Sequence, residues 1–121
     1  MSVPFKNVDH IQLAMPAGLE NEARGFYRDL LGMSEVQKPP ELVERGGVWF
    51  RSDRVFVHIG VDPDFRPALK AHPGFVCNDF AGLVLRLRSQ DVEILNGEPL
   101  EDGRRHCYVA DPFGNRIELI E

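Results

Sequence analysis

Asp111-Pro112-Phe113-Gly114-Asn115-Arg116-Ile117-Glu118-Leu119-Ile120 is the stretch of sequence with the clearest structural signal. Proline at the second position and glycine at the fourth predict a tight turn over residues 111–114. Residues 115–120 then alternate, which predicts a strand with Glu118 on one face and Ile117 and Leu119 on the other. A carboxylate in the middle of a strand is unusual unless it is exposed, paired or bound to a metal, so Glu118 is a candidate ligand.

Three histidines complete a set of four candidate ligands that repeats along the chain. His10 and His72 each open a short apolar stretch, and they are 62 residues apart. His58 and Glu118 each lie inside a later strand-like stretch, 60 residues apart. A polar residue at matching points of two half-length units indicates one site built from two copies, so this set predicts a metal site.

The first half of the chain predicts a strand, a helix and further strands. Residues 8–15 alternate as a strand does, with His10 and Gln12 on one face. Residues 19–31 place apolar residues on one helical stripe and acidic residues in the first turn, and Gly32 stands at the expected C-terminal cap. The remaining predictions for this half are strands over 47–51 and 55–61, a hairpin at 52–54, and a short or edge strand before Pro39-Pro40.

A polar, proline-containing connector over residues 62–70 separates this unit from a second unit with the same order of elements. Asn78 and Asp79 offer an N-terminal cap for a helix over 80–88. The strands of the second unit are expected over 72–77, 92–95, 105–110 and 115–120. The order βαβββ, repeated, predicts one α+β domain over 1–121, with modules of about 5–61 and 71–121.

Composition excludes several classes of protein. The 121 residues are 43% apolar and 27% charged, which is typical of one soluble globular domain. A net charge of −5, with no run of basic residues, argues against nucleic acid and against an anionic membrane surface. No signal peptide or apolar segment of about 18 residues is recognisable. We therefore expect a cytoplasmic protein with reduced thiols, in which Cys77 and Cys107 are small core residues.

The four candidate ligands suit a particular group of metals. Imidazole nitrogen and carboxylate oxygen bind Zn, Ni, Mn or Fe without a thiolate. Three protein ligands leave coordination positions open, which is typical of a catalytic site. His10, His72 and Glu118 form such a set, and His58 is either a fourth ligand or a residue that orients the substrate. His106 has no counterpart in the repeat, so we interpret it as a residue outside the ligand set.

The chain resembles the vicinal oxygen chelate superfamily, which includes glyoxalase I, fosfomycin-resistance thiol transferases, bleomycin-resistance proteins and extradiol dioxygenases. The resemblance covers nearly the whole chain. Its most specific parts are the helix that ends in Phe-Tyr-x-x-Leu-Leu-Gly and the Asp-Pro-Phe-Gly-Asn turn before a strand that carries Glu118. The stretches involved are Asp9-His10-Ile11-Gln12-Leu13-Ala14, Ala23-Arg24-Gly25-Phe26-Tyr27-Arg28-Asp29-Leu30-Leu31-Gly32-Met33, Ala71-His72-Pro73 and Tyr108 to Glu118.

This resemblance implies two tandem βαβββ modules whose eight strands form a curved mixed sheet around a central cavity with one divalent metal ion. The family's ligand positions would fall on His10, His72, Glu118 and His58. Family members commonly form homodimers, some by exchanging modules, so a homodimer is expected. The sequence departs from glyoxalase I at His58, where that enzyme has a carboxylate.

The main functional hypothesis is a glyoxalase-like metalloenzyme of the lyase or isomerase type, in which the ion binds two adjacent oxygens of a small substrate. Glu118 would then be the catalytic base, with His58 as the alternative. Residues that could bind an anionic part of the substrate are Arg104, Arg105 and Tyr108, and more weakly Arg66 and Lys70. Three alternatives stay open: a thiol transferase, an Fe(II)-dependent dioxygenase, and a non-catalytic protein that binds a drug or metabolite.

Overall fold

Two four-stranded sheets of the same design make up residues 2–121, which the computed structural model describes. The first, in the order β1-β4-β3-β2, consists of β1 (Ile11–Met15), β2 (Ser34–Val36), β3 (Val48–Ser52) and β4 (Val55–Val61). The second, in the order β5-β8-β7-β6, consists of β5 (Gly74–Val76), β6 (Leu95–Asn96), β7 (His106–Ala110) and β8 (Arg116–Ile120). In each sheet the first strand runs parallel to the last, and the other pairs are antiparallel. The predicted α+β fold with a repeated βαβββ order is thus confirmed.

Helices follow the first strand of each module, as the sequence patterns predict. In the first module α1 (Glu20–Ala23) continues into the π-helical segment η1 (Arg24–Leu30), and a 3-10 helix, η2 (Pro40–Arg45), precedes β3. Gly32 follows η1 with φ of +80°, a left-handed conformation that glycine adopts at low cost. In the second module the side chain of Asp79 accepts a hydrogen bond from the Gly82 amide at 3.0 Å and caps α2 (Phe80–Ser89).

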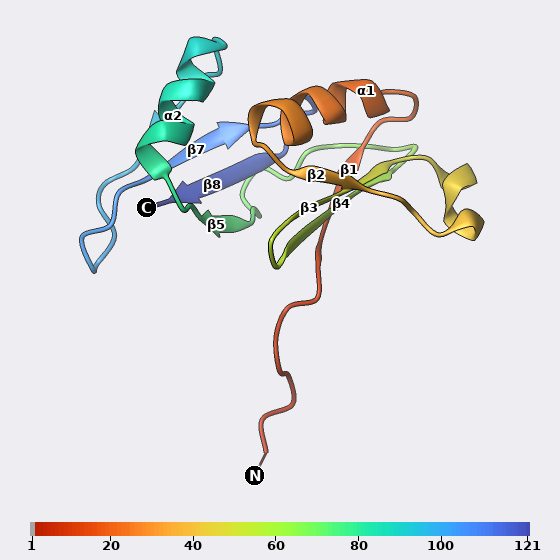
Figure 1. Cartoon of the computed structure of the whole chain (residues 1–121), viewed down its shortest axis with the longest axis horizontal. Helices are drawn as coiled ribbons and strands as arrows, with labels where there is room; N and C mark the ends of the chain where they lie inside the picture. Colours follow the sequence, from red (N-terminus) through yellow and green to blue (C-terminus); the bar gives the residue numbers. More distant parts are fainter. Residues whose placement is uncertain (1) are drawn as a thin grey trace.

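One face of each sheet is buried under the helices. The α1–η1 segment and α2 lie on the same side of the strands, and neither covers the opposite side (Figure 1). The core on the helical side contains Val48, Phe50, Val57 and Ile59 of the first sheet and Cys107, Val109, Ile117 and Leu119 of the second, with Ala23, Phe26, Tyr27 and Leu87 of the helices. Burial alternates along β4, β7 and β8, so the side chains between these core residues line the uncovered faces.

A buried network of hydrogen bonds joins the two modules. The hydroxyl of Tyr27, in η1, donates to Asp111 Oδ2 at 2.6 Å. The amide of Asn115 donates to the same oxygen at 2.8 Å and to the carbonyl of Ala14, in β1, at 2.7 Å. Burial, and then the charge of Asp111, raise the pKa of Tyr27, so the phenol stays protonated and remains a donor. The two stretches that carry the family resemblance therefore contact each other and hold the modules together.

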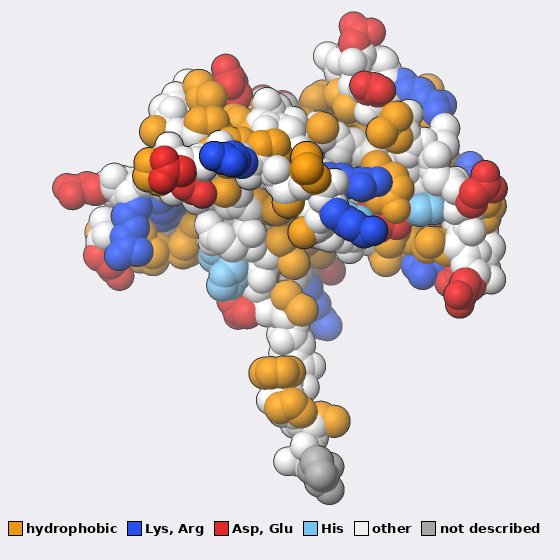
Figure 2. Space-filling model, turned by 180° about the vertical axis from the view of Figure 1, so that it is seen from behind, with side chains coloured by type: hydrophobic (Ala, Val, Ile, Leu, Met, Phe, Trp, Pro, Cys, Tyr) orange, Lys and Arg blue, Asp and Glu red, His pale blue; other side chains and the backbone are white. Residues whose placement is uncertain are grey.

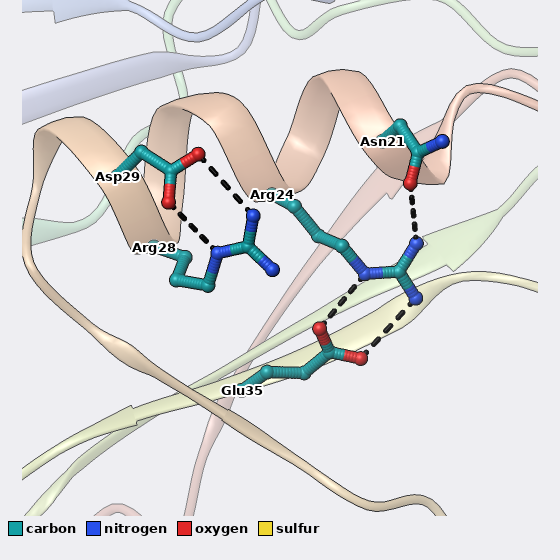
Figure 3. Close-up of polar contacts among 5 residues, drawn as sticks. All are labelled: Asn21, Arg24, Arg28, Asp29 and Glu35. Carbon is teal, nitrogen blue, oxygen red and sulfur yellow. Dashed lines mark hydrogen bonds and ion pairs between the residues drawn. The ribbon is translucent and has the colours of Figure 1, made fainter.

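An exposed ion pair holds the first helix to β2. Arg24 donates to both carboxylate oxygens of Glu35, at 2.8 and 3.2 Å, and to Asn21 at 2.9 Å (Figure 3). Arg28 pairs with its neighbour Asp29 on the same surface. The two-point contact between Arg24 and Glu35 fixes the helix against a short edge strand, which confirms the expectation of a short strand before Pro39-Pro40.

Three predicted strands differ from the observed ones by two residues or more. The strand predicted over 92–95 is wrong, because Val92 donates to the Leu87 carbonyl at the end of α2 and β6 is limited to Leu95–Asn96. β1 and β5 begin later than predicted, at Ile11 and Gly74. His10 and His72 therefore lie in the segments that enter these strands.

Residues 2–10, which precede β1, form an extended arm. It projects away from the sheets and carries a row of apolar side chains (Figure 1, Figure 2). Val3, Phe5 and Val8 are 82%, 84% and 70% exposed. Within residues 2–121, the helices are all too short and too polar to cross a bilayer.

Candidate metal centre

The second module places two of the candidate ligands side by side. His72 lies just before β5 and Glu118 lies in the middle of β8, and the distance from His72 Nε2 to Glu118 Oε1 is 3.0 Å. The other ring nitrogen of His72, Nδ1, is 2.7 Å from the Lys70 carbonyl. A carbonyl oxygen only accepts, so Nδ1 carries a hydrogen, and Nε2 faces the carboxylate either as a donor, with a second hydrogen, or with its lone pair. Two acceptors that face each other need a cation between them, either a proton or a metal ion.

This pair fits a divalent metal ion. Nitrogen and oxygen ligands lie about 2.0–2.2 Å from a divalent ion such as Zn, so two of them are about 3 Å apart at the right angle of octahedral coordination and about 3.4 Å apart at the tetrahedral angle. The observed separation of 3.0 Å corresponds to the right angle. The side chains of His72 and Glu118 are 23% and 14% exposed, so the ligand atoms are partly shielded from water yet remain accessible.

His106 contacts the other oxygen of the same carboxylate. Its Nδ1 is 2.7 Å from Glu118 Oε2, and its Nε2 is 2.6 Å from the Glu98 carbonyl. The side chain is only 9% exposed. The interpretation of His106 as a residue outside the ligand set stays a prediction, but sequence reasoning missed this contact with Glu118. The hairpin register could have revealed it, because the turn at 111–114 pairs Tyr108 with Glu118 and places His106 on the same face.

The two histidines control the charge of Glu118. Burial raises the pKa of this carboxyl, but the hydrogen bonds from His72 and His106 together outweigh the burial and hold the pKa below its usual range. Glu118 is therefore an anion at neutral pH, which is the form that binds a metal.

The first module builds a different arrangement from its two candidates. The ring of His58, in β4, stacks on Trp49 at 3.8 Å with an interplanar angle of 2°, and on His10 at 4.3 Å with an angle of 16°. Nδ1 of His10 is 2.8 Å from the carboxylate of Asp9, which leaves Nε2 of His10 for another partner. Burial, and then the proximity of His10, lower the pKa of His58, so this ring is neutral at pH 7.

The strand register relates the two pairs to each other. His58 pairs with Gln12, two residues after His10, and Glu118 pairs with Gly74, two residues after His72. The similar spacings in the sequence, from His10 to His72 and from His58 to Glu118, thus correspond to equivalent positions in the two sheets.

The pairs do not meet in one chain. No group of three or more His, Cys, Asp or Glu side chains within residues 2–121 is arranged to hold a metal ion. His10 and His58 belong to the open face of the first sheet, and His72 and Glu118 to the second. Within the described residues of one chain the four candidates thus form two separate pairs, and the four-ligand set stays a prediction.

The predicted substrate-binding residues lie in different places. Tyr108 lies at the candidate metal centre. The centroid of its ring is 5.3 Å from that of His72 and 5.5 Å from that of His106. Arg104 and Arg105 form exposed ion pairs with Asp102 and Glu121, respectively.

The weaker candidates in the connector lie closer to His72. Arg66 and His72 line a cavity of about 390 Å³, together with Gln12 and Arg116. Lys70 contributes its carbonyl, through the hydrogen bond to His72.

Comparison with known families agrees with this architecture. The family described as Glyoxalase/Bleomycin resistance protein/Dioxygenase superfamily matches residues 8–119. No curated protein matches the sequence.

Solved structures share the fold. A protein from Bacillus anthracis, assigned to the glyoxalase family, is 42% identical with a TM-score of 0.95, over 100% of this chain and 98% of that one. Lactoylglutathione lyase from Agrobacterium tumefaciens is 22% identical with a TM-score of 0.72, over 98% and 96% of the two chains. A fosfomycin resistance protein from Listeria monocytogenes is 15% identical with a TM-score of 0.74, over 96% and 93%. At these low identities the last two similarities concern the fold alone.

Proposed function

Since the chain belongs to the Glyoxalase/Bleomycin resistance protein/Dioxygenase superfamily, we propose that it is a metal-dependent enzyme of the lyase or isomerase type. It would bind a small substrate through two adjacent oxygens on a divalent ion. The observation that carries this proposal is the 3.0 Å approach of His72 Nε2 and Glu118 Oε1, with the His72 tautomer fixed by the Lys70 carbonyl. Zn, Ni, Mn and Fe all suit these ligands.

The third ligand in this proposal is His10 of a second copy of the chain. His72 and Glu118 alone leave a site incomplete, and Nε2 of His10 is available because Asp9 holds Nδ1. The exposed apolar arm that leads to His10 supports pairing with another copy, since Val3, Phe5 and Val8 would gain burial there. The active form would then be a homodimer with two equal sites. We place it in the cytoplasm, because Cys77 and Cys107 are free thiols.

The chemistry follows from these roles. A bound divalent ion withdraws electron density from the substrate oxygens and so acidifies the adjacent carbon. Glu118 is the first candidate for the base and His58, neutral at pH 7 because its pKa is lowered, is the second. Tyr108 flanks His72 and would contact the substrate.

A second candidate function is the addition of a thiol or another nucleophile to a small chelating substrate. One observation favours it: Glu118 is the only carboxylate among the four ligand candidates, and both its oxygens are engaged by His72 and His106. A carboxylate held in this way suits a ligand better than a mobile base. Assays with the adduct of a 2-oxoaldehyde and a thiol, and with fosfomycin plus a thiol, distinguish the two functions.

Metal analysis tests the proposal directly. The purified protein is stripped with EDTA, loaded with Zn, Ni, Mn or Fe(II), desalted and analysed for bound metal. We expect about one ion per chain, and near-complete loss in His72→Ala. Less than about a tenth of an equivalent with every metal would contradict the enzyme proposal and favour a metal-free binding protein.

Mixed dimers test the origin of the third ligand. His10→Ala and His72→Ala chains each bind poorly alone, but a mixed dimer pairs the intact His72 and Glu118 of one chain with the intact His10 of the other. Random exchange makes about half of the dimers mixed, and each mixed dimer has one complete site of two, so we expect mixing to restore about a quarter of the wild-type metal content. If the three ligands came from one chain, mixing would restore none.

A further inference from the structure

His106 is placed to control how Glu118 binds a metal. Its ring lies against β8 and is only 9% exposed, and each of its nitrogens faces an oxygen acceptor. Because both oxygens only accept, the ring bonds to both as the imidazolium, with a hydrogen on each nitrogen. The Glu98 carbonyl fixes the ring from one side at 2.6 Å, and Glu118 Oε2 receives the other nitrogen at 2.7 Å. Gly97 leaves the space for this ring, because a Cβ atom at that position would overlap the His106 imidazole.

The two oxygens of Glu118 therefore have separate partners. Oε2 is held by His106, and Oε1 is directed toward Nε2 of His72. A carboxylate with one oxygen engaged in this way can offer only the other oxygen to an ion. A free carboxylate can bind with both oxygens and fill an additional coordination position. A substrate that binds through two adjacent oxygens needs those positions to be open.

We propose that His106 is a positioning residue that holds Oε2 of Glu118, so that the carboxylate presents Oε1 alone to the metal ion and leaves coordination positions for the substrate. This inference rests on the proposed metal site and adds a residue that the repeat of candidate ligands does not contain. The first module has no equivalent, since Gly47 stands two residues before Trp49, where His106 stands two residues before Tyr108.

Two amide substitutions separate the two hydrogen bonds of His106. In His106→Asn the amide occupies the position of Nδ1 and keeps the bond to Glu118. In His106→Gln the amide reaches the position of Nε2 and keeps the bond to Glu98 instead. Both variants lose the imidazole, so a role in packing alone predicts similar effects.

We expect metal affinity, measured by competition with a chelating dye, to stay within about threefold of wild type in His106→Asn and to fall about 10- to 100-fold in His106→Gln. The visible spectrum of the Co(II)-loaded protein should weaken in His106→Gln, as coordination number rises when both carboxylate oxygens bind. Gly97→Ala, which pushes the ring from behind, should act like His106→Gln. Equal affinities and spectra in the Asn and Gln variants would overturn the proposal.

A metal-free measurement separates this inference from the proposed function. The side-chain carboxyl ¹³C resonance of Glu118, in the EDTA-treated protein, should shift in His106→Gln and stay near its wild-type position in His106→Asn. If the wild type binds no metal but this pattern is seen, the proposed function fails and the positioning of Glu118 by His106 stands. If the resonance is the same in all three proteins, the positioning role is wrong whatever the metal result.

Discussion

The two modules have the same strand order but place different side chains around the equivalent residues His58 and Glu118. In the first, His58 lies in a stack of three rings, between Trp49 and His10. In the second, the equivalent Glu118 lies between His72 and His106 and is bound to each through one oxygen. The difference between the modules lies in these side chains, since the pairing of the strands is the same.

Only one of these surroundings calls for a cation. The stacked rings of His10, His58 and Trp49 contact each other through their faces, and this contact needs no bound ion. In the second module, by contrast, lone pairs of His72 and Glu118 face each other at 3.0 Å, which is stable only with a proton or a metal between them. If the proposed function holds, metal affinity resides mainly in the second module, and the first module contributes His10 and an aromatic wall.

Substitution at equivalent positions should give the largest difference between the modules. We expect Glu118→Gln to weaken metal binding about 100-fold or more, because it removes the anionic ligand and places an amide beside His72. His58→Gln, the matched change in the first module, should alter the affinity by less than about threefold. Isothermal titration with Zn or Ni measures both. An equal loss in the two variants would make His58 a ligand and remove the asymmetry.

Much of this arrangement is readable from the sequence. The spacing of His10 and His72, and of His58 and Glu118, corresponds to equal strand positions in the structure. The alternation in 115–120 correctly places Glu118 on the open face and buries Ile117 and Leu119. Both predictions depend on local periodicity, which the sequence states directly.

What the sequence did not predict depends on contacts between distant segments. The separation of the two pairs follows from how the sheets sit relative to each other, and no local pattern encodes that. The role of Tyr27, Asp111 and Asn115 was missed for the same reason, since Tyr27 and Asp111 are 84 positions apart and become partners only in the folded chain. Their motifs identify the family because they support its fold.

Removing the hydrogen bond between Tyr27 and Asp111 tests how much this contact between the modules stabilises the fold. Tyr27→Phe removes the phenol that donates to Asp111 Oδ2 and leaves this buried oxygen only the bond from the Asn115 amide, so we expect the free energy of unfolding to fall by about 1–2 kcal/mol. Urea denaturation measures it. Tyr108→Phe is the matched control, because its hydroxyl has no hydrogen bond within the described residues, and it should change stability by less than about 0.5 kcal/mol. Similar losses in both would show that the Tyr27 bond is not special.

The aromatic stack of the first module should make stability depend on pH. Burial lowers the pKa of His58 in the folded state, so below about pH 6.5 the unfolded chain takes up a proton that the folded chain resists. The neutral His58 ring therefore contributes its full stabilisation of the folded state above about pH 6.5, and this stabilisation is lost as the pH falls toward the pKa of His58 in the folded state. In EDTA, the wild type should therefore lose more stability between pH 7.5 and 5.5 than His58→Gln. A larger loss in the variant would reverse the sign and contradict the stacked, neutral ring.

An ion pair holds the helix of the first module, and an N-terminal cap stabilises the helix of the second. Removing either should change the free energy of unfolding only slightly, so this is the smallest difference that we expect between the modules. The Arg24–Glu35 pair of the first module is about one-third exposed, so Glu35→Gln should cost only about 0.5 kcal/mol. Added salt screens exposed charges, and the cost should disappear near 1 M NaCl. The second module relies on the Asp79 cap, in which the carboxylate accepts a 3.0 Å hydrogen bond from the Gly82 amide. We therefore expect Asp79→Ala to cost about 1 kcal/mol, with most of that cost retained in salt. Denaturation of both variants with and without salt measures the contrast. Equal salt sensitivity would mean that both helices are held by screened charge alone.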